Sequence, residues 1–206
     1  MEFLLVIVAS YLIGSIPNGL IIGQTFYKTD LRQFGSKNIG ATNAYRTLGP
    51  GPAFWVFLSD ALKGVVGVLI GQYIGGSALA EVAGGIGAIA GHNWSVFLKF
   101  KGGRGVATGL GVVAMLSPKV TLIVFIIWAF IVYFTRYVSL ASIVAAAFVP
   151  ITMWILNARQ EFYYFGMLAA LFVIARHRPN IERLLAGTEA KIKAGGKPET
   201  GSPKEK

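Results

Sequence analysis

The chain has 206 residues, of which 54% are hydrophobic and 14% charged, and its formal net charge is +10. Ordinary soluble domains carry roughly 25% charged residues, so this composition excludes a typical soluble globular protein. Cysteine is absent, which excludes disulfides, thiolate nucleophiles and Cys-ligated metals, and two histidines argue against a His-rich metal site.

The apolar residues fall in blocks separated by short charged loops, a pattern typical of an all-α integral membrane protein. We expect one membrane domain over residues 1–187 and a disordered basic cytoplasmic tail over residues 188–206. Seven apolar segments follow one another: 3–23, bent near Pro17, then 52–74, 78–97, 106–116, 120–134, 138–156 and 162–174. The fourth and the seventh are short, so the alternative to about seven transmembrane helices is five full spans with two shorter insertions.

The distribution of lysine and arginine predicts the orientation of these segments. With the N-terminus outside and seven alternating spans, most basic residues lie in the inner loops, whereas the outer loops hold only Lys119 and Arg159. This bias accounts for the positive charge without a nucleic-acid partner. It also places the polar runs described next on the cytoplasmic face.

The first polar run is GSKNIGATNAYR at residues 35–46. Gly35 and Gly40 allow close approach of the backbone to a ligand. Short hydroxyl and amide side chains and one guanidinium accompany them: Ser36, Asn38, Thr42, Asn43 and Arg46. Such a set suits a multiply charged oxyanion such as phosphate, and an ordinary polar loop between membrane helices is the alternative.

The second run has two cations among glycines just before an apolar helix that begins near Val106: Lys101, Gly102, Gly103, Arg104 and Gly105. Glycine N–H groups at a helix N-terminus, together with two cations, predict an anion site. The spacing is not that of a Walker motif. The alternative is that these positive charges only determine membrane topology.

Two shorter runs carry polar side chains three positions apart. Ser139 and Ser142 share one face of an expected helix, where close helix packing is the alternative role. His177 and Asn180 lie among arginines at a membrane boundary, where capping or interfacial contact is the alternative. Separately, Asp60 and Lys63 lie within an apolar segment, three positions apart. We predict a structural ion pair that anchors the neighbouring loops, and a functional site inside the membrane is the alternative.

In this order, the polar runs resemble the bacterial acylphosphate-dependent glycerol-3-phosphate acyltransferases, the PlsY family. The resemblance extends over residues 11–187. It rests on YLIGSIPNG at 11–19, GSKNIGATNAYR at 35–46, DALKG at 60–64, KFKGGRGVATGLG at 99–111, RYVSLAS at 136–142 and RHRPNIERLLAG at 176–187. Two positions depart from the family pattern, because Arg104 stands where the family usually has Lys, and Lys37 where a small residue is frequent.

The resemblance implies a multi-pass enzyme of the bacterial inner membrane with its active site facing the cytoplasm. It would transfer a fatty acyl group from acyl phosphate to the 1-hydroxyl of sn-glycerol 3-phosphate, giving lysophosphatidic acid and inorganic phosphate in phospholipid biosynthesis. The bilayer and an acyl-phosphate-forming enzyme that hands over the donor are the expected partners, without cofactor or metal. The resemblance assigns the acyl-phosphate end to Ser36, Asn38, Gly40, Thr42 and Asn43, and glycerol 3-phosphate to Arg46, Arg104, Ser142, His177 and Asn180.

The residues themselves suggest how such a reaction would proceed. An acyl phosphate is already an activated anhydride, and the chain has no cysteine and no serine adjacent to a histidine. We therefore predict direct attack by the acceptor hydroxyl, with its proton passing to His177 or to the acceptor's own phosphate. Ser36, Arg46 and Arg104 complete the predicted catalytic set, and Lys101, Gly102 and Gly103 join the predicted substrate-binding set.

Three other functions are alternatives for such a membrane protein. A small anion transporter would be expected to show paired inverted repeats and polar runs near the midplane, and the sequence shows neither. A phosphatidyl transferase would be expected to cluster aspartates around Mg²⁺, whereas this chain has only Asp30 and Asp60, and an acyl-CoA-dependent acyltransferase is a further alternative. The acyltransferase using acyl phosphate is the preferred prediction.

Overall fold

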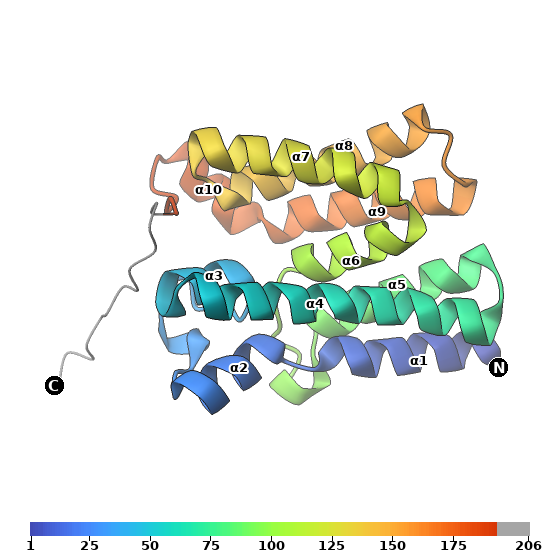
Figure 1. The fold of residues 1–206 in the computed structure, drawn as a ribbon, viewed down its shortest axis with the longest axis horizontal. Coiled ribbons are helices and arrows are strands. Elements are labelled where there is room, and N and C mark those ends of the chain that lie inside the picture. The colour runs from blue at the N-terminus through green and yellow to red at the C-terminus, as the bar shows by residue number, and fades with distance from the viewer. Residues whose placement is uncertain (193–206) are drawn as a thin grey trace, which may run out of the picture.

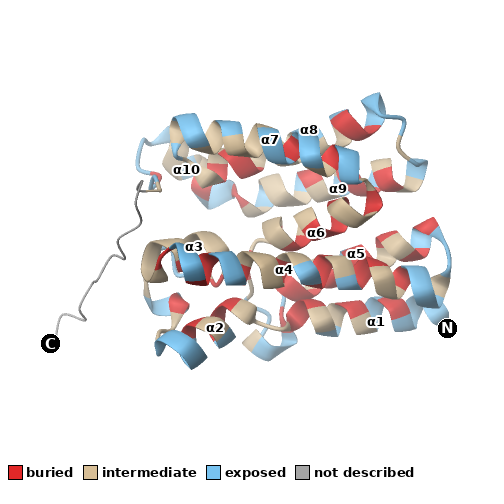
Figure 2. Ribbon diagram, in the orientation of Figure 1, coloured by how far each residue is buried: buried red, intermediate tan, exposed pale blue. Residues whose placement is uncertain are grey.

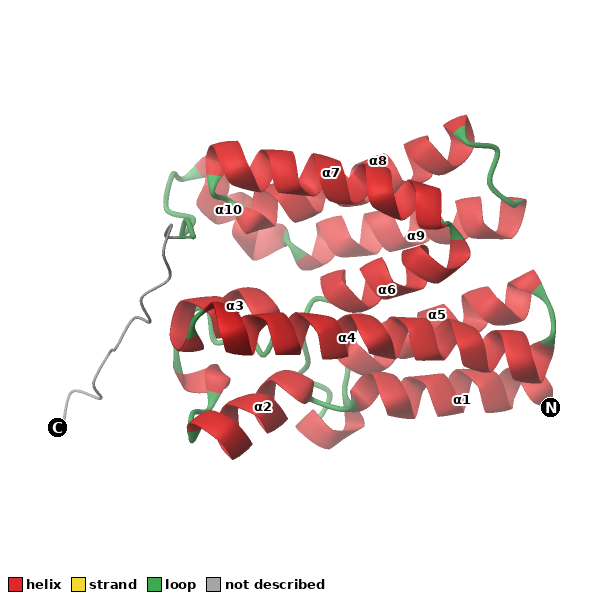
Figure 3. Ribbon diagram, viewed as in Figure 1, coloured by secondary structure: helices red, strands yellow, loops and turns green. Residues whose placement is uncertain are grey.

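A computed structural model describes residues 1–192, and this part of the chain is helical with no strand (Figure 3). The all-α prediction is confirmed. The α-helices are α1 (Glu2–Ser15), α2 (Asn18–Tyr27), α3 (Ala41–Leu48), α4 (Pro50–Ile70), α5 (Ala78–Asn93), α6 (Val106–Leu116), α7 (Pro118–Thr135), α8 (Val138–Ile155), α9 (Gln160–Arg176) and α10 (Arg178–Leu185). Short 3₁₀ turns at Leu31–Gln33 and Val96–Leu98 and a π-turn at Gly71–Gly75 complete the order.

The first predicted segment is broken rather than bent. Ile16 has extended backbone angles, φ −58° and ψ 120°, and Pro17 follows it. Proline disfavours helical angles in the residue before it and has no N–H to donate, so α1 ends at Ser15 and α2 starts at Asn18. The break leaves the carbonyl group of Ile16 available to a side chain from another helix.

Four helical stretches of the described chain are long and apolar enough to cross a membrane: Glu2–Tyr27, Pro50–Gly75, Pro118–Thr135 and Val138–Ile155. α5, α6 and α9 have 16, 11 and 17 residues, short of the ~20 residues that span a bilayer at 1.5 Å per residue. The predicted number of seven spans therefore stays a prediction.

The helices form two layers joined by a short helix (Figure 1). α1, α4 and α5 pack together in one layer, and α7, α8 and α9 in the other. α6 contacts α4 on one side and α7 and α9 on the other, so it connects the layers. The largest buried apolar cluster runs through this connection and includes Val68, Val112, Val120, Met153 and Phe165.

Small residues bring the helices of the first layer close together. A Cβ added at Gly14 of α1 would overlap the carbonyl oxygen of Ala88, and one at Gly91 of α5 would overlap that of Tyr11. Such glycines let helix backbones approach closely, which is how helices associate where lipid removes most of the hydrophobic driving force. The end of α5, which carries His92, is thereby fixed against the end of α1.

The outward surface of the bundle is apolar. Large hydrophobic side chains are exposed along α7, including Leu122, Ile126, Phe130 and Phe134, and the outer faces of the other long helices show the same exposure (Figure 2). An exposed apolar surface of this extent fits contact with lipid chains.

Residues 188–192 lie against the helical domain, although the sequence predicted a disordered tail from residue 188. Glu189 is buried, and the N–H of Ile192 donates to the carbonyl of Arg136 across 2.9 Å. The domain contacts therefore continue past residue 187. The remainder of the predicted tail, residues 193–206, lies outside the described residues.

Candidate active site

The loop before α3 is organised by Asn43, which is 1% exposed. Its Oδ1 accepts the N–H of Ser36 across 2.8 Å, and its Nδ2 donates to the carbonyls of Leu31, Phe34 and Asn38 at 2.8–3.1 Å. The Oδ1 of Asn38 in turn accepts the N–H of Gly40 across 2.9 Å. The amide of Asn43 thus shapes the loop, which presents Ser36 and Asn38 to a cavity, while the first turn of α3 presents Thr42.

The glycine loop before α6 differs from its prediction. The N–H of Gly102 donates to the carbonyl of Asn93 and that of Gly103 to the carbonyl of His92, at 3.1 and 3.0 Å. Arg176 donates to the carbonyl of Gly103 across 2.9 Å. Because these groups hold the loop to its surroundings, the two glycine N–H groups do not form the predicted anion cradle.

Arg104 is the residue of this loop that reaches the cavity together with Gly105. Lys101 is exposed, and neither it nor Gly102 nor Gly103 lines the cavity. Burial lowers the pKa of Arg104 below its ordinary value, and the nearby positive charge of Arg183 lowers it further. A half-buried guanidinium next to another cation is a strong site for an anion.

His177 lies between α9 and α10 and is 2% exposed. Its Nδ1 is 2.7 Å from the carbonyl oxygen of Val173, which can only accept, so Nδ1 carries the proton and Nε2 carries the lone pair. Burial is the main cause that lowers the pKa of His177, and the positive charge of Arg104 acts in the same direction. A neutral imidazole with a basic Nε2 is the form that a general base requires.

Glu189 is a site residue that the sequence prediction missed. Its Oε1 accepts from Ser139 Oγ across 2.8 Å and from Asn180 Nδ2 across 2.7 Å, and its Oε2 accepts from Arg183 Nε across 2.7 Å. Burial raises the pKa of this carboxyl, but the three hydrogen bonds outweigh burial and lower it overall. The only sequence signal was an isolated acidic residue just after the basic run that holds Arg183.

Ala190, the residue after Glu189, also contacts an element of the site. Arg46 of α3 donates from Nη2 to the carbonyl of Ala190 across 2.8 Å. The segment after α10 therefore connects α3, α8 and α10 at one end of the bundle, where Figure 1 shows these three elements and the end of the described chain.

These elements surround a cavity of about 530 Å³. Ten predicted site residues line it: Ser36, Asn38, Gly40, Thr42, Asn43, Arg46, Arg104, Ser142, His177 and Asn180. The rest of the lining includes apolar side chains: Phe54, Phe57, Val113, Phe125, Trp128 and Val149. The cavity therefore combines cationic and hydrogen-bond-donating groups with apolar surface, which suits a molecule with an anionic head and a hydrocarbon chain.

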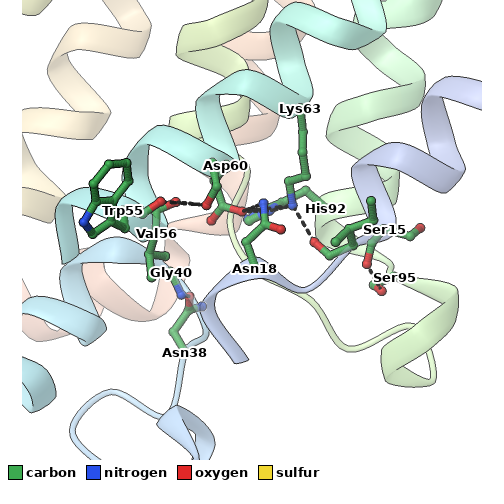
Figure 4. A network of polar contacts seen from close by, with 12 residues as sticks. Ser15, Asn18, Asn38, Gly40, Trp55, Val56, Asp60, Lys63, His92 and Ser95 are labelled. Carbon is green, nitrogen blue, oxygen red and sulfur yellow. Dashed lines mark hydrogen bonds and ion pairs between the residues drawn. The ribbon is translucent and has the colours of Figure 1, made fainter. Parts of the chain in front are cut away.

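The predicted ion pair between Asp60 and Lys63 is present (Figure 4), and Asp60 also lines the cavity. Lys63 Nζ lies 2.9 Å from Asp60 Oδ1, 2.9 Å from the carbonyl oxygen of Ile16 and 3.1 Å from His92 Nδ1. Asn18 Nδ2 donates to the same Asp60 oxygen across 3.4 Å. Asp60 and Lys63 are 2% and 5% exposed, so the pair is held inside the bundle at the break between α1 and α2.

Together, the apolar bundle and this cavity define an integral membrane protein with a cavity of mixed polar and apolar lining. Residues 4–187 match the family model described as Glycerol-3-phosphate acyltransferase, and the chain belongs to this family. It is therefore a membrane acyltransferase, as the resemblance predicted.

Curated relatives and solved structures agree with this family. The chain is 50% identical over 190 residues to "Glycerol-3-phosphate acyltransferase 2" of Moorella thermoacetica, covering 92% of this chain and 97% of that protein. It is 45% identical over 189 residues to the enzyme of Desulforudis audaxviator, with 92% and 95% covered. The crystal structure of PlsY (YgiH), an integral membrane glycerol 3-phosphate acyltransferase in its glycerol 3-phosphate form, superposes with a TM-score of 0.87 at 37% identity over 94% of this chain and 96% of that one. The lysophosphatidic acid form of PlsY superposes with a TM-score of 0.86 at 36% identity over the same shares of the two chains.

Proposed function

We propose that this enzyme transfers a fatty acyl group from acyl phosphate to the 1-hydroxyl of sn-glycerol 3-phosphate, giving lysophosphatidic acid and inorganic phosphate. The observation that carries this proposal is the mixed lining of the cavity, in which the guanidinium groups of Arg46 and Arg104 occur together with apolar side chains such as Phe57 and Val149. An acyl phosphate combines the same two kinds of group, since its phosphate is joined through a carbonyl carbon to a hydrocarbon chain. The acceptor brings a second phosphate to the cationic groups.

The two substrates would bind to different elements around the cavity. The loop before α3 would hold the phosphate of the donor through Ser36, Asn38 and Gly40, together with Thr42 from the first turn of α3, while Asn43 keeps that loop in shape. The remaining polar side chains would hold glycerol 3-phosphate: Arg46, Arg104, Ser142, His177 and Asn180. Charge supports this division, because the guanidinium groups are at the part of the cavity nearest to α10 and its following segment.

The reaction needs no covalent enzyme intermediate. The acceptor oxygen attacks the acyl carbonyl carbon, an ester bond forms, and the bond from that carbon to the phosphate oxygen breaks, so inorganic phosphate leaves. The hydroxyl proton passes to His177 Nε2, or to the acceptor's own phosphate, whose second pKa is near about 6. Arg46 and Arg104 would stabilise the negative charge that develops on the carbonyl oxygen and on the leaving phosphate.

The enzyme would lie in the bacterial inner membrane, with its N-terminus outside and the polar groups of the cavity facing the cytoplasm. The excess of lysine and arginine in the predicted inner loops supports this orientation. Glycerol 3-phosphate would then enter from the water phase. The apolar donor would arrive through the bilayer, where an acyl-phosphate-forming enzyme could hand it over.

The test uses purified enzyme in detergent or lipid mesophase with glycerol 3-phosphate and either palmitoyl phosphate or palmitoyl-CoA. We expect acceptor-dependent phosphate release and lysophosphatidic acid with palmitoyl phosphate, and no product with the thioester. Product from palmitoyl-CoA alone would replace the proposed donor. If a folded sample is inactive with both donors, Arg104→Lys separates an unfavourable Arg104 from a wrong assignment, because activity would return only in the first case.

A further inference from the structure

The contacts of Lys63 determine the tautomer of His92. An ammonium group has three N–H donors and no acceptor. Lys63 uses them on Asp60 Oδ1 at 2.9 Å, on the Ile16 carbonyl at 2.9 Å and on His92 Nδ1 at 3.1 Å. Since Nδ1 accepts, the proton of the neutral His92 ring is on Nε2. Figure 4 shows these side chains converging on the break between α1 and α2.

The other side of the His92 ring lies against the glycine loop. A Cβ added at Gly103 would overlap His92 Nε2, with Cε1 and Cδ2 of the ring at 2.9 and 3.0 Å. The backbone of His92 also accepts the N–H of Gly103 across 3.0 Å. His92 is 5% exposed and lines the cavity, so the ring is held between Lys63 and the loop. Arg104 is the residue that follows Gly103.

We propose that His92 is a positioning residue for the phosphate-binding guanidinium of Arg104. Asp60 holds the ammonium group of Lys63, and Lys63 holds the His92 ring with its Nε2–H toward the loop. The ring then packs so closely against Gly103 that no side chain would fit at this position, and this contact keeps the loop in place. The inference rests on the proposed function, in which Arg104 binds the phosphate of the acceptor. It assigns the buried Asp60–Lys63 pair a role in substrate binding beyond holding helices together.

A double-mutant cycle tests the contact between ring and loop. We expect Gly103→Ala to raise the KM for glycerol 3-phosphate roughly tenfold, because the new Cβ displaces either the ring or the loop. In a His92→Ala background the same change should add less than about twofold, since the obstructing ring is gone. Gly102→Ala is the matched control, because its Cβ would meet backbone atoms of His92 and Asn93, which His92→Ala does not remove. Its effect should be the same in both backgrounds.

Conservative variants test the role of Nε2. The amide nitrogen of glutamine can occupy the place of Nε2, whereas that of asparagine reaches only to the place of Nδ1. We expect His92→Gln to keep the KM within about threefold, and His92→Asn and His92→Ala to raise it roughly tenfold while kcat at saturating acceptor falls less. If all three His92 variants have a lower melting temperature but an unchanged KM for glycerol 3-phosphate, the proposal is overturned. The Asp60–Lys63 pair and His92 would then contribute only to stability.

The cycle also separates this inference from the proposed function. If wild-type enzyme turns over neither donor, the proposed function fails, and the stabilisation of each variant by inorganic phosphate in thermal unfolding replaces KM as the readout. Loss of that stabilisation in His92→Ala and its retention in His92→Gln would still support positioning of Arg104. Additive effects of Gly103→Ala and His92→Ala on both the melting temperature and the phosphate response would overturn it.

Discussion

The hydroxyl of Ser139 donates to the carboxylate of Glu189 across 2.8 Å, which ties the start of α8 to the segment that follows α10. The same carboxylate oxygen accepts from Asn180, a residue that lines the cavity. Glu189 thereby holds the amide of Asn180 in one orientation and balances the charge of Arg183. Three elements of the site thus depend on one carboxylate that lies in the predicted tail.

Glu189→Gln should destabilise the enzyme by about 1–3 kcal/mol, because Arg183 loses a buried ionic partner, and raise the KM for glycerol 3-phosphate several-fold through Asn180. Unfolding in detergent and steady-state kinetics measure the two effects. Glu182→Gln is the matched control, since Glu182 pairs with Arg178 on the surface, where both side chains are more than half exposed. A surface pair contributes little, so this control should resemble wild type.

The pH dependence of stability should also report Glu189. Its hydrogen bonds lower its pKa in the folded enzyme below the ordinary value of 4.5, so the unfolded chain binds the proton more readily. Its contribution is therefore present above about pH 4.5 and is lost as the pH falls through the folded pKa. Melting temperatures measured from pH 7 downward should decline below that point, and the decline should be smaller in Glu189→Gln.

His177→Gln and His177→Ala should lower kcat roughly 10²-fold or more at saturating acceptor, with little change in melting temperature, if Nε2 takes the acceptor proton. Near-normal turnover in both variants would exclude His177 as the general base. The phosphate of the acceptor would then be the remaining candidate for that role. Val173 also lines the cavity, and it contacts Nδ1 through its backbone carbonyl, which an alanine retains. Val173→Ala should therefore leave kcat close to that of wild type.

The acid limb of the rate profile offers an independent measurement. Burial and the charge of Arg104 lower the pKa of His177, so its Nε2 stays unprotonated to a lower pH than that of a free histidine. We expect kcat/KM to hold constant down to below about pH 6.5 and then to fall as the imidazole is protonated. In Arg104→Met, which removes one cause of the shift, this limb should move to higher pH.

Arg104 also tests the departure from the family pattern. Arg104→Lys keeps a positive charge but loses the planar fork, so we expect the KM for glycerol 3-phosphate to change less than tenfold. Arg104→Met should raise it about ten- to a hundredfold, the loss expected for a charged hydrogen bond to phosphate. Lys101→Met is the control, because Lys101 is exposed and does not line the cavity. It should leave KM within about twofold.

Asp60→Asn and Lys63→Met should each destabilise the enzyme by about 3–5 kcal/mol, since each leaves one buried charge without its partner. The double variant should recover much of the loss, because both charges are gone. If His92 depends on Lys63, however, the KM of the double variant should stay raised. If the double variant recovers both its stability and its KM for glycerol 3-phosphate, the Asp60–Lys63 pair has only a structural role.

Much of the fold could be predicted from the sequence because its signals are local. The long apolar runs became α4, α7 and α8 close to their expected bounds, and Pro17 was correctly expected to interrupt the first apolar segment, although it breaks this helix rather than bending it. Polar residues at short spacings also identified most of the site, including His177 with Asn180 and the residues of the first loop. These features depend on neighbours within a few positions, so the chain itself reports them.

Other features depend on residues that are far apart in the chain. Glu189 meets Ser139 at a distance of 50 positions, and Ala190 meets Arg46 at 144. The direction of the Gly102 and Gly103 N–H groups was mispredicted, because the backbone of His92 and Asn93 at the end of α5 accepts both bonds. By itself, the sequence determined the long apolar helices, the family and the chemical kinds of side chain at the site. Only the packing of α1, α4, α5 and the segment after α10 decided which of those side chains face the cavity, because a hydrogen bond needs two partners within about 3 Å and local patterns do not specify distant partners.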